Sequence, residues 1–468
     1  MAEARGRARV VAFVAAIVAV GLLILLAARG SSDGAGSTAA AAQANPGAQA
    51  TADARANAAA PANAGGKHPV IFVGNNWEGT ADVISTRGKN FRLIDRINIV
   101  PDFDERIDEI MNPLNPKFDP ERLGYFLAIR EAVGEGHDQL VDDMYSTPDG
   151  RLLVVSRPSF KDVIGLRLAG PKTGEIKWRF EVAGQRSDHM AVSPDGEQVA
   201  VSASTGNVVH LLDTDTGDEE GTFMSGDSPH ENTYSADGKR IYHASIGLVY
   251  TPGDEGAIDT DTNKGERVFQ VVDTKTQKII SKVDMGQKLE EAGYPDLSAA
   301  VRPMAITANE KRAFLQVSFF HGVVEYNLRK EKVVRVTRLP NLSTRNREQY
   351  LLDSAHHGIA LSGNDKRLCI AGTESDYATV VSRKRLRKKP SLEPKLIEKG
   401  LKPYWSTTSA NGKHCYVSWS GTDDISVISY RKRKEIAHIP VGDEGGQPAH
   451  PQRIRNGFVR DSFVAANR

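Results

Sequence analysis

The sequence predicts an all-β domain built from a repeated four-stranded unit, and two observations support this prediction. First, an apolar strand, a tight polar turn and a second strand recur at intervals of roughly 40 residues, which is typical of propeller blades. Second, most copies are followed by two more short strands joined by a polar hairpin, as at Val208–Met224. The strand–turn–strand copies are MYSTPDGRLLVVS (Met144–Ser156), MAVSPDGEQVAVS (Met190–Ser202), TYSADGKRIYHAS (Thr233–Ser245), MAITANEKRAFLQVS (Met304–Ser318), IALSGNDKRLCIAG (Ile359–Gly372) and STTSANGKHCYVSWS (Ser406–Ser420).

An incomplete copy at Pro69–Ile99 holds three strands and lacks the first one. The missing strand is predicted at the other end of the chain, where His450–Val459 has the form of a first strand. The C-terminus would then complete the first blade and close the ring, which removes exposed sheet edges. The predicted fold is therefore a seven-bladed β-propeller over residues 68–460, with a small helical insertion at 102–142 and a C-terminal tail at 461–468.

The repeats resemble those of the YVTN-repeat family of seven-bladed propellers. Tyr416-Val417-Ser418-Trp419 comes close to the strand sequence that names the family, and the six turns follow its pattern. The resemblance covers about Pro69 to Val459. It implies the fold more strongly than a function, because propellers host many activities; the family also includes lactonases and is similar to redox and cofactor-binding propellers.

The N-terminal segment predicts export. Residues 1–9 contain Arg5, Arg7 and Arg9, and Val10–Ala28 is apolar and uncharged. At about 1.5 Å per residue this run just spans a bilayer core of about 30 Å. The positive-inside rule places the N-terminus in the cytoplasm and the propeller outside, as a single-pass membrane protein. The alternative is a signal peptide cleaved near Ala28, which would make the protein secreted; the length of the apolar run favours an uncleaved anchor.

Residues 29–67 are rich in Ala, Gly, Ser, Asn and Pro and are predicted to form a disordered, flexible linker. Cys369 and Cys415 are the two cysteines of the chain, and both lie in second strands of neighbouring blades. Counted from their turns, Cys369 lies four residues after Asp365, whereas Cys415 lies three residues after Gly412. Because side chains alternate along a strand, we expect the two cysteines to point to opposite faces and not to form a disulfide.

Extra residues gather in loops expected on one face of the propeller, which we call the top face. This face holds the loops that lead into first strands and those between second and third strands. Long loops on a rigid scaffold usually carry function. Within the first insertion, Asp119-Pro120-Glu121 is a helix-start signal. The insertions are Asp102–Asp142, Thr251–Arg267, Gln287–Val301 and Asn341–Ala355.

Polar residues at the start of the predicted first strands are candidates for a binding site at the top of the central channel. When the repeats are aligned on their turns, most histidines fall at this end. His321 lies near a second-to-third-strand loop on the same face. The candidate ligand-binding residues are Asp143, Asp188, His189, His230, Glu231, Arg302, His321, His357, Tyr404 and His450.

A transition-metal ion is one possible cofactor, with His189, His230, His357 and His450 as candidate ligands, because imidazole suits copper, zinc and iron. The alternative is that these side chains hydrogen-bond neighbouring loops or bind an organic ligand. His356 and His357 are adjacent and cannot both face inward. Two other patterns are rejected: Asp259–Gln270 lacks the glycine and glutamate of a calcium loop, and Asp353, Ser354 and His356 are near one another without evidence of triad geometry.

Basic runs occur at Arg383–Lys389 and Arg431–Lys434, at hairpins expected on the opposite, bottom face. They could contact anionic lipids or wall polymers. The net charge of +1 gives no general attraction for nucleic acid. The leading hypothesis is a binding or scaffold module at the cell surface. The alternatives are a metal-dependent redox enzyme or lactonase-like hydrolase using the same face, and a purely structural envelope protein.

Overall fold

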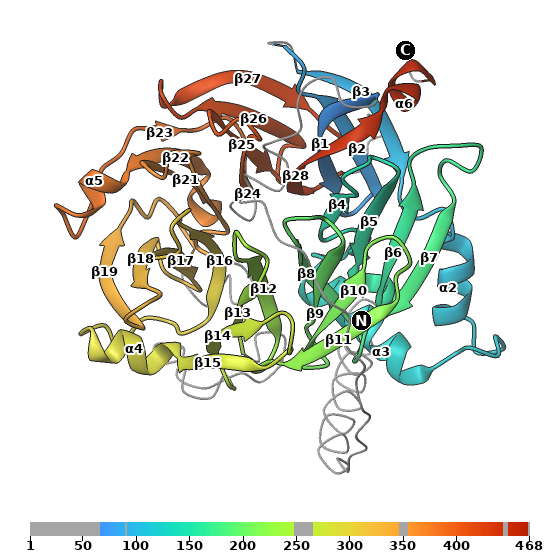
Figure 1. Cartoon of the computed structure of the whole chain (residues 1–468), viewed down its shortest axis with the longest axis horizontal. Coiled ribbons are helices and arrows are strands. Elements are labelled where there is room, and N and C mark those ends of the chain that lie inside the picture. Colours follow the sequence, from blue (N-terminus) through green and yellow to red (C-terminus); the bar gives the residue numbers. More distant parts are fainter. Residues whose placement is uncertain (1–65, 89–90, 248–264, 346–353, 443–447, 467–468) are drawn as a thin grey trace, which may run out of the picture.

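The propeller fold is confirmed in a computed structural model that describes residues 66–88, 91–247, 265–345, 354–442 and 448–466. Seven four-stranded antiparallel sheets stand around a central axis as blades (Figure 1). Most first strands contact the first strand of a neighbouring blade around this axis. Because all of these strands run in the same direction, their starts meet at the top face.

The strands of blades two to seven follow one another in chain order from the axis outward. Blades two to four comprise β4 (Met144–Ser146), β5 (Leu152–Arg157), β6 (Asp162–Arg167), β7 (Ile176–Glu181), β8 (Ser187–Val192), β9 (Gln198–Ala203), β10 (Val208–Asp213), β11 (Glu219–Met224), β12 (Pro229–Tyr234), β13 (Arg240–Ser245), β14 (Val268–Asp273) and β15 (Ile279–Asp284). Blades five to seven comprise β16 (Val301–Ile306), β17 (Ala313–Val317), β18 (Gly322–Asn327), β19 (Lys332–Arg338), β20 (Gly358–Leu361), β21 (Arg367–Gly372), β22 (Tyr377–Ser382), β23 (Leu396–Ile397), β24 (Pro403–Thr408), β25 (His414–Trp419), β26 (Asp424–Ser429) and β27 (Lys434–Pro440).

The first blade joins the two ends of the domain, as the sequence predicts. It contains β1 (Lys67–Asn75), β2 (Thr80–Ser85), β3 (Arg92–Asn98) and, innermost, β28 (Pro451–Arg460). β28 pairs antiparallel with β1 from Lys67↔Arg460 to Asn75↔Pro451. The last strand of the chain thus closes the ring onto the first.

The repeated turn motif has a shared physical cause. In blades two to seven, a serine or threonine at the end of the first strand accepts a hydrogen bond through its hydroxyl from the backbone N–H five residues later. The Asp or Asn two residues after the hydroxyl accepts a bond from it, so the side chains fix a compact loop. The six pairs are Thr147 with Leu152, Ser193 with Gln198, Ser235 with Arg240, Thr307 with Arg312, Ser362 with Arg367 and Ser409 with His414.

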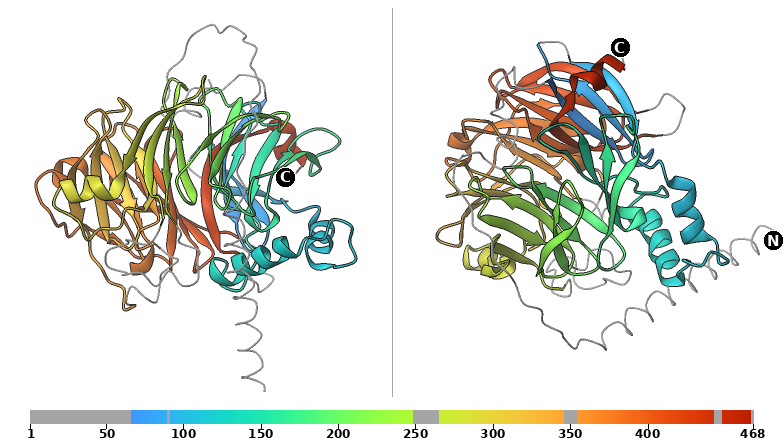
Figure 2. Two further views of the ribbon diagram at one scale, coloured as in Figure 1. Left: turned by 90° about the horizontal axis from the view of Figure 1, so that it is seen from below. Right: turned by 45° about the vertical axis from the view of Figure 1, so that its right-hand side comes forward.

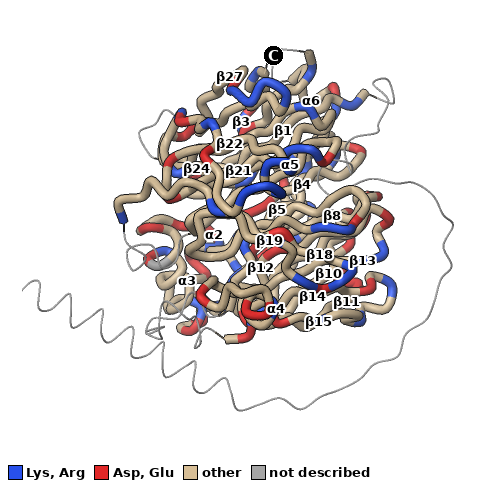
Figure 3. Tube along the Cα trace, turned by 90° about the vertical axis from the view of Figure 1, so that its left-hand side faces the viewer, with Lys and Arg blue, Asp and Glu red and all other residues tan. Residues whose placement is uncertain are grey.

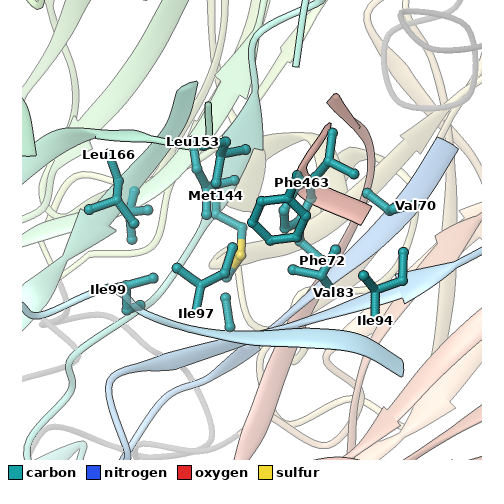
Figure 4. Close-up of a cluster of buried hydrophobic side chains, with 14 of the residues drawn as sticks. Val70, Phe72, Val83, Ile94, Ile97, Ile99, Met144, Leu153, Leu166 and Phe463 are labelled. Carbon is teal, nitrogen blue, oxygen red and sulfur yellow. The ribbon is translucent and has the colours of Figure 1, made fainter. Parts of the chain in front are cut away.

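The hydrophobic core lies between neighbouring blades. Phe72 of the first blade packs with Met144 and Leu153 of the second, and Phe463 of helix α6 (Asp461–Ala466) covers the same cluster (Figure 4). Each blade therefore buries both faces, one against each neighbour, which explains why its strands are apolar without strict alternation.

The expectation about the cysteines was wrong, because Cys369 in β21 and Cys415 in β25 form a disulfide with a Cα–Cα distance of 6.4 Å. Their side chains do lie on opposite faces of their own sheets: Leu368 faces blade five and Tyr416 faces blade one. Stacked blades, however, meet through opposite faces. The face of blade six that carries Cys369 is therefore the one that contacts the Cys415 face of blade seven.

The helical insertion lies outside the ring, beside blade two. It comprises α2 (Phe103–Met111) and α3 (Pro120–Ala132) (Figure 2). α3 starts as the sequence predicts, with the Asp119 carboxylate accepting a hydrogen bond from the Glu121 N–H. Shorter helices are α4 (Met285–Glu291), α5 (Arg383–Leu386) and the 3-10 turns η2 (Pro158–Phe160) and η4 (Thr373–Ser375).

A buried cluster of charges fastens the insertion to the blade. The guanidinium of Arg157, at the end of β5, bonds the carboxylates of Asp102 and Asp162. Arg106 of α2 donates to the carbonyl of Phe160 at 2.9 Å. Arg157 and Asp162 are fully buried, so each charge depends on its partner for stabilisation.

Within the described part of the chain, no helix has the length and apolar character needed to cross a membrane. The predicted membrane segment at Val10–Ala28, the linker up to residue 65 and the loop at Asp259–Asn263 lie outside the described residues.

Candidate functional site

Three histidines meet on the central axis at the top face. His189 lies in β8, His230 in β12, and His357 directly precedes β20. The ring centroids of His189 and His230 are 3.7 Å apart, and that of His357 lies 5.9 Å from His189 and 5.8 Å from His230. One nitrogen from each ring lies within 4.8 Å of the other two, and all three side chains are buried. We call this group the histidine centre.

A repeated backbone contact positions the start of three first strands, those of blades three, four and one. Between β9 of blade three and β12 of blade four, the Ser202 hydroxyl donates to the carbonyl of His230. The corresponding Ser156 donates to the carbonyl of Asp188, and Ser418 to that of Gln452. The bond fixes each strand start against the preceding blade, so the side chains of this position and the next are held near the axis.

A carboxylate orients one histidine of the centre. Nδ1 of His189 lies 2.9 Å from a carboxylate oxygen of Glu231. With the proton on Nδ1, the imidazole donates to Glu231, and Nε2 keeps its lone pair. Burial lowers the pKa of all three imidazoles well below the usual value, and the positive charges of neighbouring arginines lower it further. The histidines are therefore neutral at pH 7.

Arginines and aromatic rings complete the surroundings of the centre. The guanidinium of Arg453 lies 3.6 Å from the ring centroid of Trp405, whose centroid is 5.9 Å from that of His189. Tyr404 stacks on His357 at 4.2 Å. Arg302 of β16 is also near the centre, where its positive charge lowers the pKa of His230 and His357. We call the histidine centre and these neighbours the axial cluster.

Acidic residues on blades two and three balance these cations. Arg455 binds Asp143 through two hydrogen bonds of 2.9 and 2.8 Å. A guanidinium nitrogen of Arg453 lies 3.5 Å from Asp142. Burial raises the pKa of Asp142 to about 7; Arg453 opposes this shift, and the charges of Asp188 and Asp143 add to it. The cluster thus holds about as many cations as anions.

Several buried polar atoms of the axial cluster have no hydrogen-bond partner among the described residues. Such atoms are rare in folded proteins, and each requires an explanation. They are Nη2 of Arg302, Nε and Nη1 of Arg453, Nε1 of Trp405 and Nδ1 of His230 and His357.

A small cavity continues along the axis below the cluster. Its volume is about 70 Å³, and its lining includes Thr233, Ala305, Ala360 and Trp405. Sites for drug-sized molecules measure about 300–1,000 Å³. This cavity therefore suits an ion or a single small group rather than a whole organic ligand.

The structure brings most of the sequence-predicted residues together and separates two of them. Those in or next to the axial cluster are Asp143, Asp188, His189, His230, Glu231, Arg302, His357 and Tyr404. His321 instead lies beside His356, with a centroid distance of 5.4 Å. His356 points away from the axis, and its Nε2 is 3.2 Å from the hydroxyl of Tyr377.

His450 lies outside the histidine centre, so the predicted four-histidine set is not assembled. Its ring stacks on Trp77 at 3.9 Å, and His137 stacks on the other side of Trp77 at 4.0 Å. The cause is the register of β28. The bond from Ser418 to Gln452 marks Gln452 as the first-strand position equivalent to His230. Arg453 therefore occupies the place near the axis that the sequence alignment gave to His450.

Sequence reasoning did not select Arg453 and Trp405. The first blade has no turn between its first and second strands, because they come from opposite ends of the chain. The alignment of the turns therefore cannot be extended to the first blade. The signal that identifies Arg453 is the strand register, which only the pairing of β28 with β1 supplies.

A scan against protein-family models and a search of curated proteins both find no match to this chain.

Proposed function

We propose that this chain is an exported, membrane-tethered propeller of the YVTN-repeat type that works as a binding module. Its ligand is an anionic group, a carboxylate or phosphate, that enters the axial cluster from the top face. The observation that carries the proposal is the set of buried donors without partners, above all on Arg302 and Arg453. Guanidinium groups suit carboxylate and phosphate because their N–H groups fork in one plane.

The environment of the arginines supports this role. Arg302 uses Nε to donate to the Ser318 hydroxyl at 2.8 Å, and its buried Nη2 has no partner among the described residues and can donate to another acceptor. Arg453 is fully buried and is held in place by its stacking on Trp405. A buried guanidinium has lost its hydration, so a charge-assisted hydrogen bond from a ligand is stronger here than at the surface.

The test is calorimetric titration of the full chain with acetate, phosphate and a short acidic peptide. The Arg302→Gln variant keeps a polar side chain but removes the charge, so we expect at least tenfold weaker binding. Arg335→Gln in the same blade is the matched control. Arg335 lies on the outermost strand, β19, near Glu325 and away from the axis. Tighter binding of the peptide than of the small anions would indicate a protein partner. Equal affinities of wild type and Arg302→Gln, or no binding of any anion, would contradict the proposal.

The proposed membrane attachment is consistent with the polarity of the domain. β1 starts on the bottom face, where Lys67 donates to the carbonyl of Pro148 in the turn between β4 and β5. The basic runs Arg383–Lys389, which includes α5 (Figure 3), and Arg431–Lys434 lie at hairpins on this same face, and most of their residues are exposed. Each basic residue near an anionic surface contributes about 1 kcal/mol. The linker and the basic runs would together turn the bottom face toward anionic lipid and leave the axial cluster accessible.

Binding to vesicles tests this arrangement. The full chain should associate more strongly with vesicles of mixed zwitterionic and anionic lipid than a variant with Lys384, Arg385 and Arg387 changed to Gln. Equal association of the two proteins at low salt would remove the role of the basic runs without affecting the proposed ligand site.

A further inference from the structure

The histidine centre has the composition and spacing of a metal site. Its three rings come from three different blades, so no local sequence motif links them. One nitrogen of each ring lies within 4.8 Å of the others. In a tetrahedral zinc site with Zn–N distances of 2.0–2.1 Å, the nitrogens are about 3.3 Å apart. Metal binding would require rotations of the side chains that bring the nitrogens to this separation.

We infer that His189, His230 and His357 bind one divalent transition-metal ion of the zinc or copper type. The metal would be the element of the axial cluster that receives the anionic ligand, so this inference rests on the proposed binding function. Imidazole is a preferred ligand of zinc, copper, nickel and iron, and three protein ligands leave a coordination position open for an exogenous group.

The surroundings of His189 support metal binding. The Glu231 carboxylate accepts the Nδ1 proton of His189 at 2.9 Å. This bond fixes the ring and leaves Nε2, which lies 3.6 Å from an oxygen of Asp188, with its lone pair for a metal. Such carboxylate–histidine pairs are usual behind metal ligands. Nδ1 of His230 and of His357 is buried without a partner among the described residues, so both atoms are available as ligands.

A competing arrangement involves Asp142, Asp188 and His189, which also offer ligand atoms within 4.8 Å of one another. Both carboxylates are already occupied. Arg186 forms a salt bridge with Asp188, and Arg453 lies 3.5 Å from Asp142. A metal bound there would have to displace these guanidinium groups, whereas the three imidazoles carry no such partners. The histidine centre is therefore the better site.

The charge around the centre explains why metal and anion would bind together. The nearby carboxylates are those of Asp142, Asp143, Asp188 and Glu231, and the nearby guanidinium groups are those of Arg186, Arg302, Arg453 and Arg455. These charges offset one another. A dication would leave the buried site with a net positive charge, which is unfavourable in a buried environment. An anion that binds both the metal and the guanidinium groups would reduce the free-energy cost of burying this charge.

The experiment measures metal content and ligand type in the full chain, purified without a polyhistidine tag. The protein is stripped with a chelator, loaded with Zn²⁺ and dialysed, and the bound metal is counted by mass spectrometry. We expect about one ion per chain in wild type and a loss of binding in His230→Gln and in His357→Gln. His450→Gln is the matched control, because His450 is equally buried but stacks on Trp77. It should keep the ion.

Two additional readouts keep the result decisive if a variant does not fold. Cu²⁺ bound to wild type should show coupling to imidazole nitrogens in its electron paramagnetic resonance spectrum. Glu231→Gln should weaken Zn²⁺ binding about 10–100-fold, as expected for a residue that orients a ligand. Binding far below one ion per chain, a spectrum without nitrogen coupling, or unchanged binding in folded His230→Gln would each overturn the inference.

The anion titrations separate this inference from the proposed function. If chelator-treated protein binds no metal but still binds an anion in a manner that depends on Arg302, the metal site is wrong and the binding function stands. If neither metal nor anion binds, both are wrong. Anion binding that strengthens after Zn²⁺ loading supports both.

Discussion

Removal of the Cys369–Cys415 disulfide is expected to lower the free energy of unfolding by about 4 kcal/mol. The two cysteines are 46 residues apart in the sequence. In the chain-entropy relation, a loop of this length removes about 13.5 cal/mol/K from the unfolded state, which is about 4 kcal/mol at 25 °C. With an unfolding entropy of about 0.8 kcal/mol/K for a domain of about 390 residues, the melting temperature should fall by about 5 °C.

The assay compares wild type with the Cys369→Ala/Cys415→Ala double variant by thermal and urea unfolding, each with and without reductant. Both cysteines are fully buried, so alanine is used instead of serine, whose hydroxyl would be unpaired in the interface between blades. Reductant should destabilise wild type and leave the double variant unchanged. If reductant has no effect on denatured-and-refolded wild type, or if the double variant is as stable as the oxidised protein, the disulfide does not stabilise the domain.

Three further predictions concern other buried groups. Burial lowers the pKa of His243 to about 3 from about 6.5, so the contribution of the neutral imidazole to stability is present above pH 6.5 and is lost as the pH falls toward 3. His243→Gln should therefore reduce the slope of the unfolding free energy against pH on the acid side by up to about 1.4 kcal/mol per pH unit. Urea titrations at several pH values measure this slope, and an unchanged slope would refute the prediction. A Cβ on Gly165 would lie 2.3 Å from Nε1 of Trp178, so Gly165→Ala should cost about 1–3 kcal/mol in thermal unfolding, whereas Gly124→Ala, with nothing within 4 Å of its Cβ, should not destabilise. Arg157→Met should cost about 3–5 kcal/mol by leaving its buried carboxylate partners unpaired and should expose the insertion to limited proteolysis; a cleavage pattern identical to that of wild type would show that this cluster does not hold the insertion.

The repeat pattern was sufficient to predict the blades because each blade depends on local chemistry. A hydroxyl, an Asp or Asn and a backbone N–H five residues on form one turn, and these residues are contiguous in the sequence. The return of the C-terminus to the first blade could also be predicted, since an unpaired set of three strands requires a fourth. These inferences need only strand counting and turn residues.

Relations between blades could not be obtained in the same way. The pairing of Cys369 with Cys415 depends on how two sheets stack, and a face assignment within one strand does not give it. The position of Arg453 depends on the register of β28 with β1, which are joined by no turn. Sequence alignment placed His450 there because it carried the turn-based spacing of the other blades into the one blade that lacks the turn.

The same geometry explains why the axial cluster has no sequence motif of its own. A propeller contributes one or two side chains from each blade to its axis, so residues that touch are separated by a whole repeat. His189 and His230 are 41 positions apart in the sequence, yet their rings are 3.7 Å apart. Each residue is free to change without altering its blade, because the turn and the interface between blades are made by other positions. The repeated residues therefore determine the fold, whereas the residues that differ between repeats determine the chemistry of the axis. Those departures from the repeat, His189, His357 and Arg453 among them, are where substitution should change binding while leaving the propeller folded.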